Sequence, residues 1–301
     1  MATASTLNVP RRRDSGVMAL TRKFLGSLRF RVVPEAMVIF LLALVIASFV
    51  AKWIMPFPAL RGDPDMRLLA PDVRWDFWNG HIMGTDQQGR DIFSRIVTGA
   101  RYSFQVSFVA IGIGAPIGAF VGMVSGYFAG KVDLALQRVV ETTLSIPTIF
   151  VGLLLVGIFG PSMTIVSITL AISLWAGYAR FIRAQTLSLR GQDFIKMAKV
   201  SGAGSPRIIL KHILPHVAST FLVIASIQVG GAILAEAGLS FLGAGVPAPL
   251  PSWGAMANDG RAYIRTAWWV AVFPGTMIAV IVLCFNMLGD WVRDKLDPRL
   301  Q

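Results

Sequence analysis

Long stretches without a charged residue constrain this chain more than any other feature of its sequence. The charge-free runs are 36–51, 102–130, 142–179, 217–235 and 266–289. A helix that crosses a bilayer needs about 20 mostly apolar residues. Backbone in hydrocarbon must satisfy its own hydrogen bonds, so each spanning run has to be helical. The sequence therefore predicts an all-α polytopic membrane protein.

The number of spans follows from the lengths of these runs. The run 142–179 is too long for one span, and Gly160-Pro161 within it predicts a turn between two helices. The six predicted helices lie near 35–55, 102–128, 139–159, 162–180, 217–240 and 267–289. The first is of full span length with no small-residue cleavage site behind it, which indicates a signal anchor. The single cysteine, Cys284, falls in the last span and leaves no disulfide or cysteine metal site.

Lys and Arg residues predict the orientation. They cluster in the N-terminal tail, in the segment 180–211 and at the C-terminus. Six spans place these three segments on one face, and the positive-inside rule makes that face cytoplasmic. In the segment 61–101 on the other face, aspartates balance the arginines. We interpret the net charge of +12 as mostly a topology signal, and nucleic-acid binding as the weaker interpretation, because no basic stripe lies on a soluble fold.

The segment before the second span carries helix signals. Thr85 and Gln88 match a capping box. Asp86 with Arg90, and Asp91 with Arg95, would be neighbours on a helix. We predict an amphipathic helix at the outer surface, feeding into the second span. Its apolar face would consist of Ile92, Phe93, Ile96 and Val97. It would serve as a structural elbow or as a docking surface for an outside partner.

Glycine recurs at every fourth position of the second span. The repeat includes Gly114, Gly118, Gly122 and Gly126. This spacing places the glycines on one helical stripe, which lets another helix approach closely. The "GIGAPIG" in this region looks like a dinucleotide fingerprint, but it follows no strand and lies in an apolar span. We therefore predict close helix packing.

Two ionisable residues lie near the ends of predicted spans, and such residues are candidates for function. They are Glu141 and Glu236. Glu236 would face the outer mouth of a pathway, or it would bond backbone near "GLSFLGAG". His212 and His216 have helical spacing, but Pro215 distorts that turn and no third ligand is near, so no metal site is predicted. The chain also lacks a phosphate-binding G-x-x-x-x-G-K-[ST] sequence.

A basic segment, "DFIKMAKVSGAGSPRIILKHILP" at 193–215, interrupts the apolar runs. Asp193 would cap a first helix, and Gly202 would end it. Ser205-Pro206 would begin a second helix over 206–214, and Pro215 would mark the start of the fifth span. Two interpretations are open. The segment would transmit movement from a soluble partner, or it would lie on lipid headgroups.

This segment resembles the cytoplasmic loop of ABC-importer permeases, whose pattern is E-A-A, three residues, Gly, nine residues, I-x-L-P. Ala198, Gly202, Leu214 and Pro215 match this pattern. The sequence departs from it at Lys196, Met197 and His212. The stretches "MGTDQQGRDIFSR", "AEAGLSFLGAG", "PSWGAM" and "FNMLGDWVRDKLDPRL" resemble further signatures of the dipeptide and oligopeptide (DppC/OppC-like) permeases. Nickel and glutathione members share these motifs.

The resemblance implies a MetI-like permease with six transmembrane helices that forms half of a pore with a sister DppB/OppB-like permease. It implies an ATP-driven importer of dipeptides or oligopeptides. The first alternative is the same machinery importing nickel or glutathione. The weaker alternative is an ATP-independent secondary carrier. Its partners would be two ABC ATPase subunits, which bind ATP and Mg, a solute-binding protein outside and membrane lipid, but no nucleic acid. The chain itself would hold no cofactor and no catalytic residue, in a bacterial inner membrane.

The implied organisation divides the chain into five parts. They are a cytoplasmic basic tail (1–34), the first transmembrane helix (35–55), a periplasmic segment with the amphipathic helix (56–101), a five-helix permease core with the cytoplasmic loop 187–216 (102–290) and a C-terminal tail (291–301). The loop residues implied to couple to the ATPase are Ala198, Gly202, Ala203, Ser205, Pro206, Arg207, Ile213, Leu214 and Pro215.

Overall fold

The computed structural model describes residues 16–72 and 80–296, and this part of the chain is helical apart from loops and one isolated β-bridge. The long helices are α1 (Gly16–Ile54), α2 (Ile92–Phe128), α3 (Gly130–Ser145), α4 (Thr148–Phe159), α5 (Met163–Arg190), α8 (Leu214–Phe241) and α10 (Trp269–Leu296). Shorter elements are η1 (Pro64–Met66), α6 (Asp193–Val200), α7 (Ser205–Ile208), the π-helical turn η2 (Ile209–Ile213), α9 (Trp253–Gly260) and η3 (Arg261–Tyr263). The predicted basic tails lie largely outside the described side chains, although the α1 backbone already begins at Gly16.

Five described helices are long and apolar enough to cross a membrane, and the pair α3 and α4 makes a sixth span if it is counted as one. This confirms the all-α polytopic fold. The third span differs from the prediction of one helix over 139–159, because α3 and α4 meet at an angle of 81°. The break falls at Ile146, whose φ of −95° and ψ of 118° are extended. Pro147 disfavours a helical conformation for the residue before it, which explains the bend.

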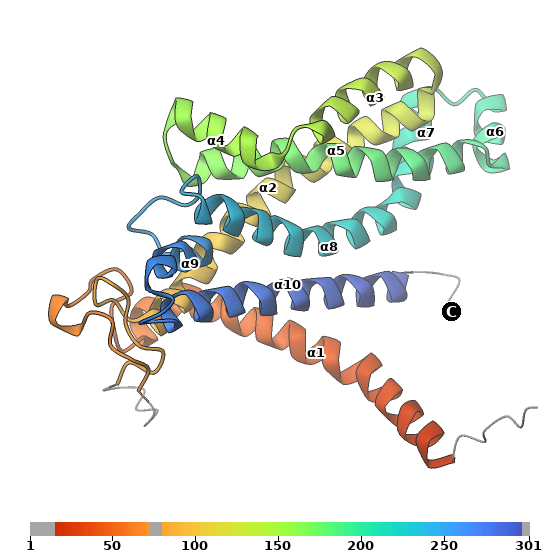
Figure 1. The fold of residues 1–301 in the computed structure, drawn as a ribbon. Coiled ribbons are helices and arrows are strands. Elements are labelled where there is room, and N and C mark those ends of the chain that lie inside the picture. The colour runs from red at the N-terminus through yellow and green to blue at the C-terminus, as the bar shows by residue number, and fades with distance from the viewer. Residues whose placement is uncertain (1–15, 73–79, 297–301) are drawn as a thin grey trace, which may run out of the picture.

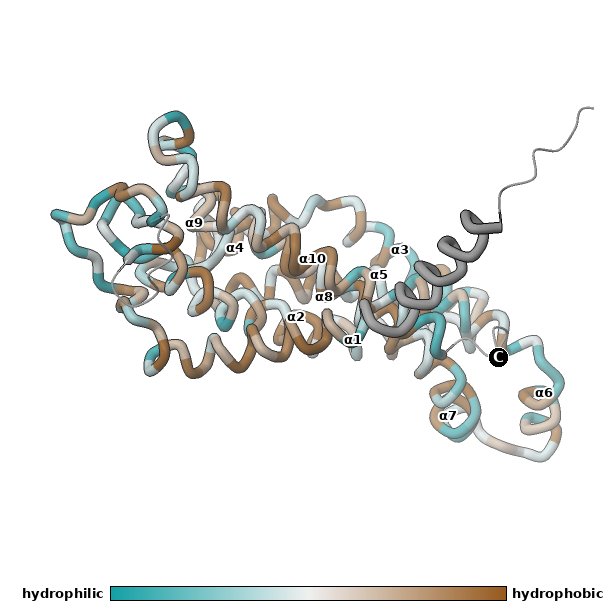
Figure 2. The backbone as a smooth tube through the Cα atoms, turned by 90° about the horizontal axis from the view of Figure 1, so that it is seen from below, coloured by the Kyte–Doolittle hydropathy of each residue, from teal (hydrophilic) through white to brown (hydrophobic). Residues whose placement is uncertain are grey.

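The helices run side by side as a bundle (Figure 1). The α2 helix packs most extensively on α5, and α10 packs on α8 and α9. The α1 helix lies at the edge and diverges from the bundle towards its N-terminal end (Figure 1). Hydrophilic residues gather at the two ends of the bundle, which fits a protein that spans a membrane (Figure 2).

One buried cluster joins six helices. Phe104 of α2 makes edge contacts with Trp253 of α9 and Phe285 of α10, with ring centroids 5.8 and 6.1 Å apart. Leu44 of α1 and Tyr178 of α5 belong to the same cluster, as does Ile233 of α8. Because lipid is as apolar as these side chains, such a cluster stabilises the bundle by close packing rather than by leaving water.

The outer segment corrects one prediction, because the helix begins only at Ile92 and the residues before it form a tight loop. Asp91 is the N-cap of α2, and its Oδ2 accepts a hydrogen bond from the Ser94 backbone at 2.7 Å. Thr85 makes no capping box with Gln88. It donates instead to the Met66 carbonyl and accepts from the Leu69 backbone at 2.8 Å.

Glycine and charge explain why this loop is not helical. Gly84 and Gly89 have φ of +74° and +71°, and a Cβ on Gly89 would lie 1.8 Å from the Asp63 carbonyl oxygen. Asp86 accepts from the Arg90 Nε at 2.7 Å, but the expected pair of Asp91 with Arg95 is absent. The Arg95 Nε lies 3.5 Å from the Asp86 Oδ2 instead. The positive φ angles of these glycines produce a compact turn and are incompatible with a right-handed α-helix.

Candidate functional site

The loop 193–215 begins with α6 and a glycine turn. Gly202 has φ of +79°, its N–H donates to the Lys199 carbonyl, and the Ala203 N–H donates to the Ala198 carbonyl, both at 3.0 Å. This is a Schellman motif, in which glycine supplies the left-handed residue at little cost. The turn therefore lies where the sequence predicts it.

The start of α6 differs from the prediction by one residue. Gln192, not Asp193, occupies the N-cap position, and its side chain makes no capping bond. Asp193 instead accepts from the Lys196 Nζ at 2.9 Å, and this hydrogen bond lowers the pKa of the Asp193 carboxyl. Lys196 thus occupies the family's glutamate position and pairs within its own helix.

The second half of the loop is not a separate helix, which corrects the prediction for 206–214. The helical backbone begins at Ser205, with Gly204 as N-cap, and continues through η2 into α8. The Leu214 N–H donates to the Ile209 carbonyl, which is a bond of the wider π type. A proline ring clashes with the carbonyl four residues earlier in an α-helix, and a wider turn next to Pro215 relieves such a clash. Pro215 therefore lies inside a continuous helix.

The buried side of the loop packs on the bundle. Ile195, Ile208 and Ile213 have no exposed surface. They belong to a cluster with Tyr127 of α2 and Ile182 of α5. Packing of this density transmits displacement, because side chains in a filled core cannot yield independently. Movement of the loop is thus tied to movement of α2 and α5.

The exposed side carries three bulky apolar residues at the hydrophilic end of the bundle. Val200, Met197 and Leu210 are 90, 70 and 62% exposed. We call these three residues the apolar loop surface. Bulky apolar side chains that gather at the surface among charges are a candidate contact surface for another protein. Sequence patterns did not identify these three side chains as exposed, although their position among lysines was a usable signal.

The structure separates the nine predicted coupling residues into three kinds by their burial. Ile213 is fully buried and packs, whereas Ala198, Ala203 and Ser205 are half-buried. The exposed ones are Gly202, Pro206, Arg207, Leu214 and Pro215. Only the exposed residues lie where they can touch a partner without rearrangement.

The glycine stripe of α2 lies against α5. A Cβ on Gly118 would lie 2.2 Å from the Trp175 carbonyl oxygen, and one on Gly122 would lie 2.5 Å from the Ala179 carbonyl oxygen. Gly114 and Gly126 likewise face α5, at 2.9 Å from the Ala171 oxygen and 2.7 Å from the Thr186 Cβ. The two backbones are therefore in direct contact, as small residues permit in membrane helices.

A charged pair fixes α3 beside this contact. Arg183 of α5 donates from Nε and Nη2 to the two carboxylate oxygens of Asp133, both at 2.6 Å. Ser125 of α2 donates to the same carboxylate. Bidentate pairs of this kind are strong and directional. No local sequence pattern predicts this pair, because its partners are 50 residues apart.

The two predicted pathway residues lie in different environments. Glu236 is fully buried on α8, where it accepts from Ser103 Oγ at 2.9 Å and from Ser240 Oγ at 2.6 Å. Ser240 accepts from the Val246 backbone at 3.1 Å, so the carboxylate organises the loop after α8 through a hydroxyl. Glu141 is 64% exposed on α3 and lies 3.7 Å from Arg138. The structure does not bring the two glutamates into one site.

Replacing Glu236 separates a packing role from a pathway role. We expect Glu236→Leu to lower the free energy of unfolding by about 3 kcal/mol, because it leaves buried serine hydroxyls without an acceptor. Glu236→Gln keeps a side-chain oxygen and should unfold close to the wild-type temperature in detergent, followed by tryptophan fluorescence. A Leu variant as stable as wild type would contradict this account, and a stable Gln variant with slowed transport would assign Glu236 to the pathway.

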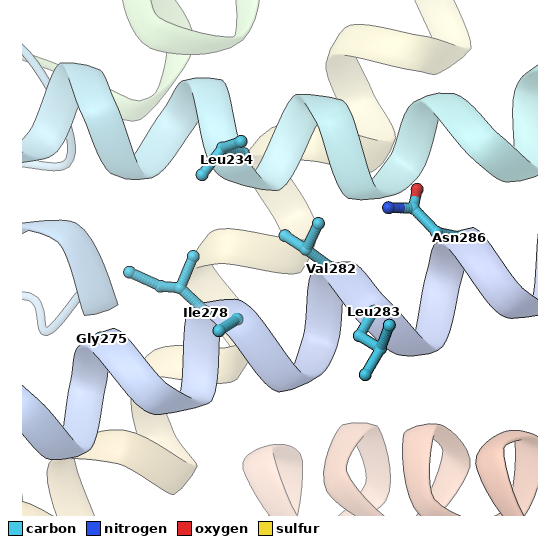
Figure 3. A pocket seen from close by; sticks show the side chains of 7 residues that line it. Leu234, Gly275, Ile278, Val282, Leu283 and Asn286 are labelled. Atoms are coloured by element: carbon cyan, nitrogen blue, oxygen red, sulfur yellow. The ribbon is translucent and has the colours of Figure 1, made fainter.

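An open groove of about 470 Å³ lies between α8 and α10 (Figure 3). It is lined by Leu234, Gly275, Ile278, Ala279, Val282, Leu283 and Asn286. Val282 and Asn286 point towards α8 (Figure 3). Asn286 contributes an amide to an otherwise apolar lining. Small residues and one polar group make this surface suited to a neighbouring helix or a polar solute. In the described part of the chain, no cluster of His, Cys, Asp and Glu could hold a metal ion.

Known proteins resemble this chain over most of its length. Residues 114–301 match the family model described as "Binding-protein-dependent transport system inner membrane component". The oligopeptide transport system permease protein OppC of Haemophilus influenzae is 39% identical over 264 residues, which is 88% of this chain and 84% of that protein. The nickel transport system permease protein NikC of Escherichia coli is 37% identical over 92% of this chain and 97% of that protein.

The fold is also shared with a solved structure. The inward-facing methionine ABC transporter MetNI matches with a TM-score of 0.60 and 18% sequence identity. The match covers 68% of this chain and 98% of that one. At this identity the likeness concerns the fold alone, and it agrees with the MetI-like permease architecture expected from the loop motif.

Proposed function

Because the chain belongs to the family of binding-protein-dependent transport system inner membrane components, we propose that it is the permease subunit through which an ATP-driven importer moves dipeptides and oligopeptides. The chain is a transport subunit of an ABC importer in the inner membrane. ATP hydrolysis would reside in two partner ATPase subunits, which bind ATP and Mg. A binding protein would deliver the peptide from outside.

The observation that carries the proposal is the two-sided loop 193–215. Its buried isoleucines join it to α2 and α5, and its exposed side presents Met197, Val200 and Leu210. An ATPase subunit that docks on this apolar loop surface would move the loop and with it the start of α8. Since the helical backbone continues from Ser205 to Phe241, the displacement would reach the groove between α8 and α10.

The proposed orientation places this loop in the cytoplasm. The C-terminal end of α10 lies at the same end of the bundle as α6 and α7 (Figure 1). An excess of Lys and Arg at this end supports a cytoplasmic location. Both termini would then be cytoplasmic, and the loop before α2 would face the binding protein.

We assign the groove between α8 and α10 to the contact with the sister permease and to the pathway between the two chains. Leu234 and Val282 would meet apolar side chains of the sister permease. Asn286 would offer its amide to a passing peptide bond, which has both a donor and an acceptor. The NikC relative supports nickel as an alternative cargo.

Co-purification followed by reconstitution tests the proposal. The chain would be expressed with its neighbouring genes, extracted in mild detergent and placed in vesicles with the binding protein. We expect a sister permease and two ATPase copies to accompany it, and labelled dipeptide to enter only with ATP. Uptake of Ni²⁺ but not dipeptide would favour the alternative cargo. A lone chain that moves solute without ATP would refute the importer assignment.

A further inference from the structure

A second open groove, of about 390 Å³, lies between α1 and α2 at the end of the bundle away from the apolar loop surface. Its mouth holds Arg101 of α2 and Phe49 of α1, and it continues along α2 past Gln105 to Phe108 and Val109. Most of its lining is apolar, as expected of a surface that faces hydrocarbon. A charged arginine at its mouth is the feature that requires an explanation.

Arg101 has no anionic partner among the residues that the structure describes. Its guanidinium carbon lies 5.0 Å above the ring centroid of Phe49, an arrangement that positions the group without using its N–H donors. No ion pair or hydrogen bond within the described chain takes up the five donors of this side chain. A cation beside hydrocarbon is costly unless an anion or water satisfies it.

A second cation lies near the same mouth. Lys52 follows Ser48 and Phe49 by one helical turn on α1, so it lies on the same side of that helix. Lys52 is exposed and forms no ion pair within the described residues. Trp53 beside it is 77% exposed, and exposed tryptophan at the end of a span marks the membrane interface. The mouth of the groove therefore lies at the depth of lipid headgroups.

The groups along α2 follow the order of the groups along a phospholipid. Arg101 suits a phosphate, Gln105 lies one turn deeper and suits the ester carbonyls, and Phe108 and Val109 lie a further turn deeper where an acyl chain would run. Phe108 and Val109 are 48 and 43% exposed in this groove. We propose that the groove binds one anionic glycerophospholipid, held at its phosphate by Arg101 and Lys52.

Charge favours this occupant over a helix of the sister permease. An apolar helix in the groove would cover Phe108 and Val109 but would leave both cations unpaired at the mouth. A zwitterionic lipid would bring a phosphate together with its own cation, which two positive side chains repel. An anionic headgroup satisfies both cations, because its phosphate accepts hydrogen bonds from them and it brings no cation of its own.

Native mass spectrometry of the purified permease complex tests the proposal. Phosphatidylglycerol and phosphatidylcholine would be titrated separately into the delipidated complex in detergent. We expect one phosphatidylglycerol to bind, with Arg101→Gln lowering its affinity about tenfold. Val109→Trp fills the groove without changing its charge and should lower the affinity as well. Arg138→Gln, which removes an exposed arginine of α3, is the matched control and should bind as wild type does.

Three results would overturn the proposal. The first is equal affinity of the wild type and the Arg101→Gln variant for phosphatidylglycerol. The second is equal binding of phosphatidylcholine. The third is efficient cross-linking of Val109→Cys to the sister permease in the assembled complex, which would assign the groove to a protein contact. None of these results bears on ATP-driven uptake, so the lipid site and the importer assignment can fail independently.

Discussion

Gly118→Leu is expected to prevent the chain from accumulating in the membrane. Even the first carbon of a side chain at this position would lie 2.2 Å from the Trp175 carbonyl oxygen and 2.7 Å from the Tyr178 Cβ. Neither neighbour can move without shifting α5, since one belongs to its backbone and the other is fixed to it. Overpacking of a filled interior usually costs about 1–3 kcal/mol, and a backbone clash exceeds the upper end of that range.

The same helix supplies the control. Gly112 has nothing within 4 Å of its would-be Cβ, so Gly112→Leu makes the same chemical change without the clash. Leucine favours the helix more than glycine does, so a loss seen only at position 118 must come from packing. Membrane-fraction immunoblots and unfolding temperatures in detergent would measure the effect. Normal accumulation and stability of Gly118→Leu would show that α2 and α5 are not in backbone contact.

Val200→Asp is expected to reduce ATP-driven uptake strongly while leaving the chain folded. The side chain is 90% exposed, and exposed substitutions usually change stability by no more than about 0.5 kcal/mol. In a docked complex, however, the new carboxylate would be buried against an apolar surface without a partner, which costs several kcal/mol. We expect uptake to fall at least about tenfold and the ATPase to be lost during purification, with Met197→Asp behaving alike.

Gln192→Asp is the matched control, because it adds the same charge to the same helix at its N-cap, where aspartate is favoured. Its uptake should equal that of the wild type. If Val200→Asp and Met197→Asp both import normally, the ATPase docks elsewhere. Deleting 206–214 would be a poorer test, since it also removes Ile208, Ile209 and Ile213 from the buried cluster.

Local signals predicted the spans and the glycine turn, and long-range contacts decided the rest. The charge-free runs and Gly202 are properties of single segments, so the sequence could identify them. The break at Ile146-Pro147 lies within an apolar run. The span was predicted from the length of that run, and this criterion takes no account of the proline that causes the break. The helix predicted from Thr85 failed because Gly89 packs on Asp63, a contact that no helical pattern encodes.

The candidate site shows the same division. The sequence could place the coupling loop between two spans, but it could not separate its buried isoleucines from its exposed side. That separation depends on Tyr127 and Ile182, which belong to helices far away in the chain. In the sequence, Asp133 and Arg183 are only charged residues that flank predicted spans. The packing of α3 on α5 brings them together as a bidentate pair.

The wide turn at Ile209–Ile213 sets the rotation of α7 relative to α8 around their common helical path. It holds one residue more than the same turn of an α-helix, and each residue of a helix advances the chain by about 100°. The extra residue offsets the rotational phase of α7 from that of α8. Relative to Glu236, Arg207 therefore projects in a direction about 100° from the one it would have in an uninterrupted α-helix. Deleting one residue of this turn would rotate α7, and with it Arg207, by about 100° around the helix axis relative to α8.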